Sequence, residues 1–130
     1  MPDLSAWAPR MLSVLRIISS LLLMQHGLQK HFAIPAREGP GPEAFSQMWI
    51  GGWIELIGGA LLLVGLFSRP VAFILSGMMA VAYWQFHAGG NFWPILNQGE
   101  LAIMYCFTFL YIFFAGPGPI SLDAMLRKRG

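Results

Sequence analysis

The sequence predicts an all-α integral membrane protein, a bundle of four transmembrane helices with both termini on the cytoplasmic side. Of its 130 residues, 56% are hydrophobic and 11% are charged, whereas a soluble domain carries about 25% charged residues. Four apolar runs, each near membrane-spanning length, alternate with segments rich in glycine and proline. The basic residues are few and lie at the ends of these runs. This pattern predicts one membrane domain and argues against nucleic-acid binding.

We expect residues 1–130 to form a single domain. Its spans are expected at 11–30, 48–67, 70–87 and 99–115, and its two long loops at 31–47 and 88–98. The side of the termini carries most of the basic residues, namely Arg10, Arg69, Arg127, Lys128 and Arg129. Lys30 and Arg37 flank the other side. The positive-inside rule therefore predicts a multi-pass protein of the inner (plasma) membrane whose long loops face outward.

One face of the first run is largely polar. At helical spacing this face comprises Arg16, Ser19, Ser20, Leu23, His26, Gly27 and Lys30. A polar stripe avoids lipid, so it should face the interior of the bundle, with Arg16 as a structural charge.

The second run, 48–67, carries a single charge, Glu55. A small-residue stripe surrounds it, made of Gly51, Gly52, Gly58, Gly59, Leu62 and Gly65. Glycines on such a stripe allow close approach of a neighbouring helix. Glu55 is interpreted either as a structural ion-pair partner or as a functional proton or ligand site.

The depth of each polar group suggests a partner for Glu55. If Lys30 and Met48 mark one membrane surface, Glu55 lies roughly 10 Å below it, His26 roughly 6 Å and Arg16 roughly 21 Å. Side chains lean toward the N-terminus of their own helix, so those of His26 and Glu55 converge. We expect His26 to be the nearest partner, then Lys30, while Arg16 remains an alternative.

The third and fourth runs add polar and aromatic groups near the outer surface. Tyr83, Trp84 and His87 end the third run as an interfacial cluster, and Trp93 lies in the second loop. Asn97 and Glu100 have capping-box spacing at the start of the fourth run, so Glu100 is either a capping residue or part of a site. The single cysteine, Cys106, is interpreted as a small buried hydrophobe.

These groups predict one functional region at the outer surface. A quinone or quinol head group needs apolar and aromatic walls with a proton donor and acceptor. The hypothesis assigns catalytic proton transfer to Glu55 and His26. It assigns ligand binding to Lys30, Tyr83, Trp84, His87, Trp93 and Glu100. Haem ligation by His26 and His87 is a weaker alternative because His87 is expected too near the surface. A metal site from the same histidines with Glu55 and Glu100 is another, since the ligand types are suitable but no defining spacing is present.

Ordered motifs run through nearly the whole chain. They are Arg16 with Gly27-x-x-Lys30, Gly52-x-x-Glu55-x-x-Gly58-Gly59, Gly65-Leu66-x-x-Arg69-Pro70, Gly99-Glu100-x-Ala102 and Gly116-Pro117-Gly118-x-x-Ser121-x-Asp123. Together they resemble the DoxX family. The resemblance implies a small four-helix bacterial or archaeal inner-membrane protein, whose relatives include subunits of a thiosulfate:quinone oxidoreductase and proteins linked to oxidative stress and quinone detoxification. It assigns no catalytic residues.

Two functions are therefore expected from the sequence. The first is a membrane subunit of a redox or oxidative-stress-related complex, a quinone-linked oxidoreductase component if it is an enzyme. The second is a non-catalytic membrane anchor or assembly subunit for a partner protein. Both imply contact with the lipid bilayer and with a partner subunit or a second copy. The sequence does not name an electron donor.

Overall fold

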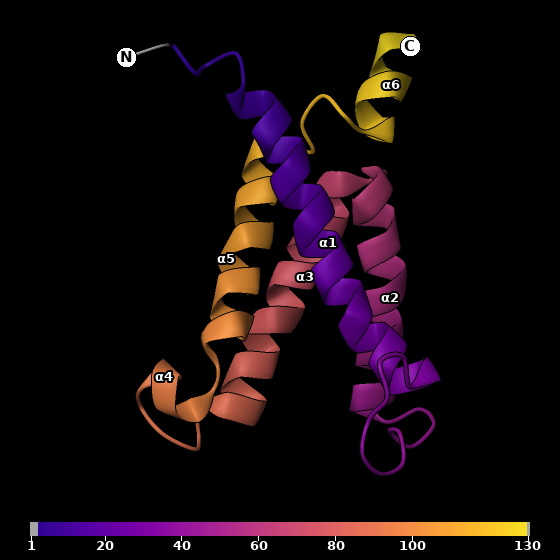
Figure 1. Cartoon of the computed structure of the whole chain (residues 1–130), viewed down its shortest axis with the longest axis vertical. Helices are drawn as coiled ribbons and strands as arrows, with labels where there is room; N and C mark the ends of the chain where they lie inside the picture. The colour runs from indigo at the N-terminus through magenta and orange to yellow at the C-terminus, as the bar shows by residue number, and fades with distance from the viewer. Residues whose placement is uncertain (1–2, 130) are drawn as a thin grey trace.

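The computed structural model describes residues 3–129, and side chains as far as Lys128. The described residues form helices, turns and loops, without a strand among them. The helical elements are α1 (Ala8–Phe32), α2 (Gln47–Val64), α3 (Ser68–Ala82), the π-helix η1 (Tyr83–His87), α4 (Pro94–Asn97), α5 (Glu100–Ala115) and α6 (Leu122–Arg129) (Figure 1).

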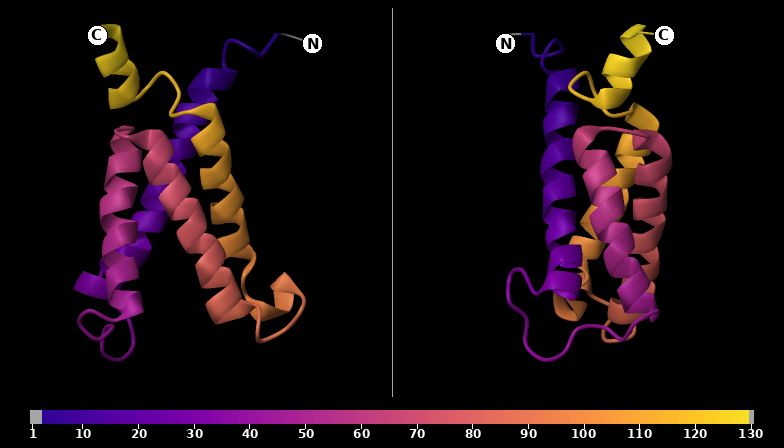
Figure 2. Two further views of the ribbon diagram at one scale, coloured as in Figure 1. Left: turned by 180° about the vertical axis from the view of Figure 1, so that it is seen from behind. Right: turned by 90° about the vertical axis from the view of Figure 1, so that its right-hand side faces the viewer.

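The long helices form two pairs. α1 packs mainly against α2, and α3 packs mainly against α5. The chain begins and ends at one end of the molecule, here called the terminal end, beside the turn between α2 and α3. The segments 33–46 and 88–99 lie at the opposite end, here called the loop end. Figure 2 shows the two pairs drawing apart toward the loop end.

Glycines set the close contact between α1 and α2. A Cβ atom on Gly27 would lie 2.6 Å from the carbonyl oxygen of Gly52, so the two backbones touch. A Cβ atom on Gly59 would lie 2.5 Å from the side chain of Met24. The predicted contact of the glycine stripe with a neighbouring helix is therefore confirmed at Gly52 and Gly59.

Two other glycines of the stripe do not contact α1, although Gly58 makes its close contact with another neighbouring helix, α3. Gly58 faces α3, where its Cβ would lie 3.1 Å from Leu75. Around Gly51, nothing in the described part of the chain lies within 4 Å of a Cβ position. Gly51 therefore makes no such contact within one copy, and its predicted alternative contact, with a second copy, stays a prediction.

The buried core is small, and much apolar surface faces outward. Its members come from all four long helices: Leu23, Leu62, Ala72, Leu75, Met79, Tyr105, Phe109 and Ile112. Large side chains such as Ile18, Ile57, Phe73 and Phe107 are at least half exposed. Among the described helices, α1 and α2 are long and apolar enough to cross a membrane, and α5 is a shorter apolar helix. Such a surface suits lipid better than water.

The third run starts earlier than expected, at Ser68, and its helix continues through η1 to His87. The fourth run begins at Glu100 after Gly99, and Asn97 accepts a hydrogen bond from the Gly99 amide at 2.8 Å. The capping-box prediction for Asn97 and Glu100 was therefore wrong. Asn97 instead ends the single turn α4, which interrupts the loop expected at 88–98.

Arg16 lies at the terminal end, away from Glu55. Its guanidinium donates to the carbonyl oxygens of Pro117 and Ile120, the latter at 2.7 Å. Ser13 donates to the same Pro117 carbonyl at 3.1 Å. The side chain is almost fully buried. Arg16 therefore joins α1 to the segment that follows α5, and the alternative pairing of Arg16 with Glu55 does not occur.

Asp123 forms further hydrogen bonds at the terminal end. Its carboxylate accepts hydrogen bonds from the amides of Phe67 and Ser68, at 3.0 and 2.9 Å, so it caps the start of α3. The Asp123 amide donates to the Gly65 carbonyl at 2.9 Å. Gly65 has a φ of 73°, a backbone conformation that favours glycine, and ends α2. The C-terminal segment is thus bonded to the turn between α2 and α3.

Candidate functional site

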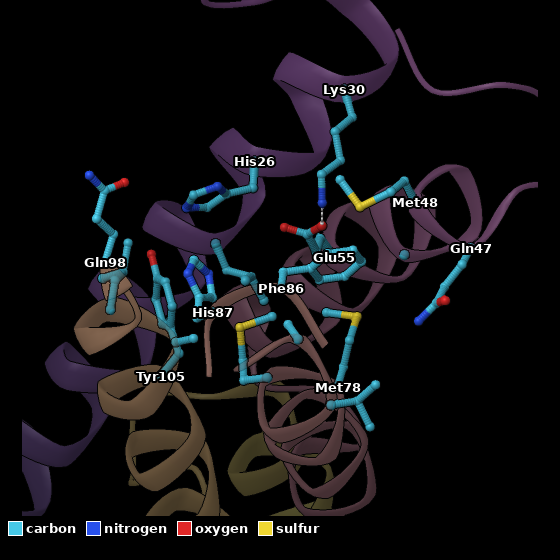
Figure 3. A pocket seen from close by; sticks show the side chains of 17 residues that line it. His26, Lys30, Gln47, Met48, Glu55, Met78, Phe86, His87, Gln98 and Tyr105 are labelled. Atoms are coloured by element: carbon cyan, nitrogen blue, oxygen red, sulfur yellow. Dashed lines mark hydrogen bonds and ion pairs between the residues drawn. The ribbon is translucent and has the colours of Figure 1, made fainter. Parts of the chain in front are cut away.

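A cavity of about 430 Å³ lies between the two helix pairs at the loop end (Figure 3). Its volume falls within the roughly 300–1,000 Å³ typical of ligand sites. Its wall is mostly apolar and comes from all four long helices and from η1. The polar lining residues are His26, Lys30, Gln47, Glu55, His87, Gln98 and Tyr105.

Glu55 and Lys30 form an ion pair on one side of the cavity. The Glu55 side chain is 5% exposed and that of Lys30 is 25% exposed. Lys30 is thus the observed partner, and the expectation that His26 would be nearest was wrong. The Lys30 side chain leans toward the N-terminus of α1 and is long enough to reach the carboxylate. Depth measured at the backbone does not include this reach.

His26 and Tyr105 lie on the other side of the cavity. Their rings meet edge to face, with centroids 6.1 Å apart and planes at 85°. Within the described residues, the buried His26 Nε2 and Tyr105 hydroxyl have no hydrogen-bond partner. Buried polar atoms are nearly always satisfied, by protein, water or ligand. Two such atoms beside one cavity therefore indicate a place where a polar ligand or water binds.

The π-helix η1 brings His87 to the cavity wall. Its Nδ1 donates to the Asn97 carbonyl oxygen at 3.1 Å. In the neutral ring this leaves Nε2 as an acceptor. Tyr83 stacks on the His87 ring with centroids 6.4 Å apart, and its hydroxyl accepts from the Asn97 side chain at 3.2 Å. Tyr83 therefore supports His87 from outside the cavity wall.

The structure brings together four of the sequence-predicted site residues, His26, Lys30, Glu55 and His87. Trp84 is 73% exposed, Trp93 is 60% exposed, and neither lines the cavity. Glu100 is exposed as well and does not line it.

Tyr105 is the functional candidate that sequence reasoning missed. It shares its buried face of α5 with Ala102, Phe109 and Ile112. This spacing is readable in the sequence, but Tyr105 is the one polar side chain of an otherwise apolar face. Sequence reasoning singled out Glu100 on the same helix instead, and that side chain is exposed.

Two of the three histidines, His26 and His87, line the cavity. Among the described residues, however, no group of three or more histidine, cysteine or acidic side chains could hold a metal ion. The residues present do not fit a multidentate metal site of the kind weighed from the sequence.

Comparison with known proteins settles the family. The sequence profile of the DoxX family matches residues 11–88. The chain belongs to the DoxX family. The matched stretch runs from α1 to just beyond η1, so it includes His26, Lys30, Glu55 and His87, while Tyr105 lies outside it.

Two relatives extend the likeness over nearly the whole DoxX chain. An uncharacterized protein of Haemophilus influenzae is 40% identical over 99% of this chain and 100% of its own length. An uncharacterized membrane protein of Mycobacterium tuberculosis is 27% identical over 97% of this chain and 87% of its own length. No solved structure matches the chain. The family and the exposed apolar helices make this a membrane protein.

Proposed function

We propose that this DoxX protein is the membrane subunit of a redox or oxidative-stress-related complex and binds a quinone or quinol head group in the cavity at the loop end. The observation that carries the proposal is the pair of unsatisfied polar atoms, His26 Nε2 and the Tyr105 hydroxyl, beside an apolar wall. A quinone ring has polar oxygens at two opposite ends and an apolar body between them. The cavity offers polar groups on two sides with apolar side chains between.

The chain's own residues would orient the ring. The Tyr105 hydroxyl donates to a quinone oxygen, and His26 Nε2 accepts from a quinol hydroxyl or, when protonated, donates to a quinone oxygen. Glu55 and Lys30 face the opposite side and offer an acceptor and a donor there. When bound, the quinone supplies reversible two-electron chemistry coupled to protons.

Protons would move between the cavity and water through the partly exposed side chains at the cavity wall. Glu55 is buried and its partner Lys30 is a quarter exposed, so the pair connects the cavity with water at the loop end. A carboxylate and an ammonium that share a hydrogen bond can pass a proton between ligand and water. His87 is a second group at the cavity wall that can exchange protons.

We further propose that the chain crosses the inner membrane four times, with both termini in the cytoplasm. α3 and η1 together give a continuous helical segment over 68–87, and α5 is largely apolar after Glu100. Labelling of single cysteines tests this, in a background in which Cys106 is replaced by alanine. A cysteine at Glu38 should react from outside the cell, and one at Lys128 only after the inner face is opened. The reverse pattern would refute the orientation.

Tyr105→Phe tests the head-group site. It removes an unsatisfied hydroxyl without changing the packing of the ring, so stability should stay equal or rise. We expect quinone that co-purifies in mild detergent to fall several-fold in this variant and in His26→Phe. Cys106→Ala, on the same helix but outside the cavity, is the control. Full quinone retention in a folded Tyr105→Phe protein would remove the support for this site.

A non-catalytic anchor or assembly subunit is the second candidate. The specific observation is α6, whose Leu122, Met125 and Leu126 are exposed at the terminal end beside Arg127 and Lys128. An apolar strip next to positive charge can bind a partner subunit or a second copy. In this case the purified protein would carry a partner and no quinone, and deletion of α6 would release that partner.

A further inference from the structure

A window in the cavity wall opens between α2 and α3. The two helices contact each other less than either contacts its own pair member, and they draw apart toward the loop end. Gly51 on α2 and Ala82 on α3 are small residues at this gap. A Cβ on Gly51 would meet open space as far as the described residues go. The cavity is therefore open sideways, toward the surface that faces lipid.

A side-chain hydrogen bond joins α2 to η1 at the edge of the window nearest the loop end. Gln47 at the start of α2 donates a hydrogen bond to the side-chain oxygen of Gln85 in η1. This amide bridge lies between the gap and the loops. An apolar substituent on a ligand in the cavity would therefore pass through the gap between α2 and α3, on the side of the bridge away from the loops, and enter the membrane.

A second, almost purely apolar hollow of about 330 Å³ runs along the outside of α2 and α3. Gly51 of the window lies on the same side of α2 as Ile54 and Gly58, which line this hollow at i+3 and i+7. On α3, Ile74 of the hollow continues into Met78 of the cavity wall at i+4. The window and the hollow therefore adjoin along α2 and α3, and the two together are called the path.

We infer that this path binds the isoprenoid tail of the quinone, so that the ligand is a long-chain, membrane-dissolved quinone that enters sideways from the bilayer. The inference rests on the proposed head-group site. The hollow extends from the level of Trp49 to Leu61, which at 1.5 Å per residue is about 18 Å of helix. Its wall has almost no polar atoms, so a methyl-branched hydrocarbon chain gains van der Waals contact there without stranding a hydrogen-bonding group.

Gly51→Leu should close the window. Leucine is a better helix former than glycine and meets open space, so the helix should remain intact. Gly77→Leu is the matched control, because Gly77 is also helical and open but lines neither the cavity nor the hollow. The measurement is the affinity of detergent-solubilised protein for a benzoquinone with a four-unit prenyl tail and for the same ring without a tail. The wild type should bind the prenylated quinone more tightly.

A second variant separates the tail path from the head site, because Gly51 also lines the cavity. Ile57→Trp fills the hollow from an exposed position, and Ile18→Trp is its control on α1. Loss of contact with about two methylene groups would weaken prenylated-quinone binding roughly tenfold. The tailless ring should bind Ile57→Trp as it binds the wild type.

The outcomes separate this inference from the function on which it rests. Equal wild-type affinity for both quinones, or a tail preference that survives Gly51→Leu and Ile57→Trp, would overturn the tail path and leave the head site standing. Displacement of the tail, but not of the ring, by added phospholipid would assign the hollow to lipid acyl chains and overturn the path too. If the wild type binds neither ring, the proposed function fails and the tail path fails with it.

Discussion

The two ends of the molecule differ in how far their buried polar groups are hydrogen-bonded by other parts of the chain. At the terminal end, Arg16 donates to backbone carbonyls and Asp123 accepts from backbone amides, so distant parts of the chain satisfy each other. At the loop end, His26 Nε2 and the Tyr105 hydroxyl face a cavity and find no partner in the described chain. At the terminal end, Ser68 Oγ and Arg16 Nε are also buried without a partner in the described chain, but neither residue lines either described hollow.

This difference separates stability from binding within one small bundle. The terminal end joins α1, the turn between α2 and α3, and the C-terminal segment. With that end closed, the helix pairs can diverge at the other end and leave space between them. Substitutions at the terminal end should therefore mainly change stability, and substitutions at the loop end should mainly change binding.

Arg16→Met should have the largest effect on stability. It leaves the part-buried Ile120 and Leu63 carbonyls without their side-chain donor, and the Pro117 carbonyl with one donor fewer. Each stranded group costs about 1–3 kcal/mol, so we expect a loss of about 2–4 kcal/mol in unfolding free energy. Thermal unfolding in detergent measures this, and Tyr105→Phe is the contrast that should lose nothing. Equal melting of Arg16→Met and wild type would contradict the division between the two ends.

Glu55→Gln should have an intermediate effect. It leaves Lys30 without its counter-charge, but Lys30 is partly exposed and can turn toward water. We expect a loss of about 1–2 kcal/mol, less than the 3–5 kcal/mol of a fully buried pair. The double variant Lys30→Gln and Glu55→Gln should recover part of this loss, while quinone retention stays low in both. A Glu55→Gln protein that is well folded and retains all its quinone would falsify the proton role.

The sequence predicted the helices better than the site. Apolar runs and the polar stripe from Arg16 to Lys30 depend on local periodicity, and the structure buries most of that stripe. The choice of partner for Glu55 depended on the reach of one long side chain. The membrane depth of the backbone positions, estimated from the sequence, ranked His26 above Lys30 as the partner of Glu55. The structure shows Lys30 as the partner.

Tyr105 and the π-helix were outside the reach of sequence reasoning for a different reason. Tyr105 becomes notable only when α5 places its ring beside that of His26 at the cavity. The π-helical turn at 83–87 follows no glycine or proline signal, yet it determines which side of the helix His87 faces. Both depend on tertiary packing between elements that are distant in the chain.

Gly27→Ala tests the contact that holds the first helix pair together. The new Cβ would lie 2.6 Å from a backbone oxygen of Gly52, which cannot move aside as a side chain can. Overpacking of this kind costs about 1–3 kcal/mol, and we expect the lower half of that range because one methyl group is added. Gly51→Ala is the control and should be neutral or stabilising. Equal melting temperatures for the two variants would show that α1 and α2 do not depend on this contact.

Asp123→Asn should have the smallest effect and a distinct pH dependence. Burial raises the pKa of the Asp123 carboxyl, but the hydrogen bonds from Ser68 and Phe67 and the charge of Arg127 together lower it below its ordinary value. A lowered pKa means that the charged carboxyl stabilises the fold fully above the unfolded value of about 4, and this stabilisation is lost as pH falls through the folded value.

At neutral pH the Asp123→Asn variant should lose about 1 kcal/mol of unfolding free energy, typical of a lost helix cap. The difference from wild type should shrink as pH falls from about 4 toward the lowered folded value, because the unfolded carboxyl then binds a proton that the folded one does not yet hold. Glu38→Gln, at an exposed loop position, is the control for general effects of acid. Thermal melts between pH 7 and pH 3 test this, and a difference that stays constant across that range would mean that the charge of Asp123 does not hold the C-terminal segment in place.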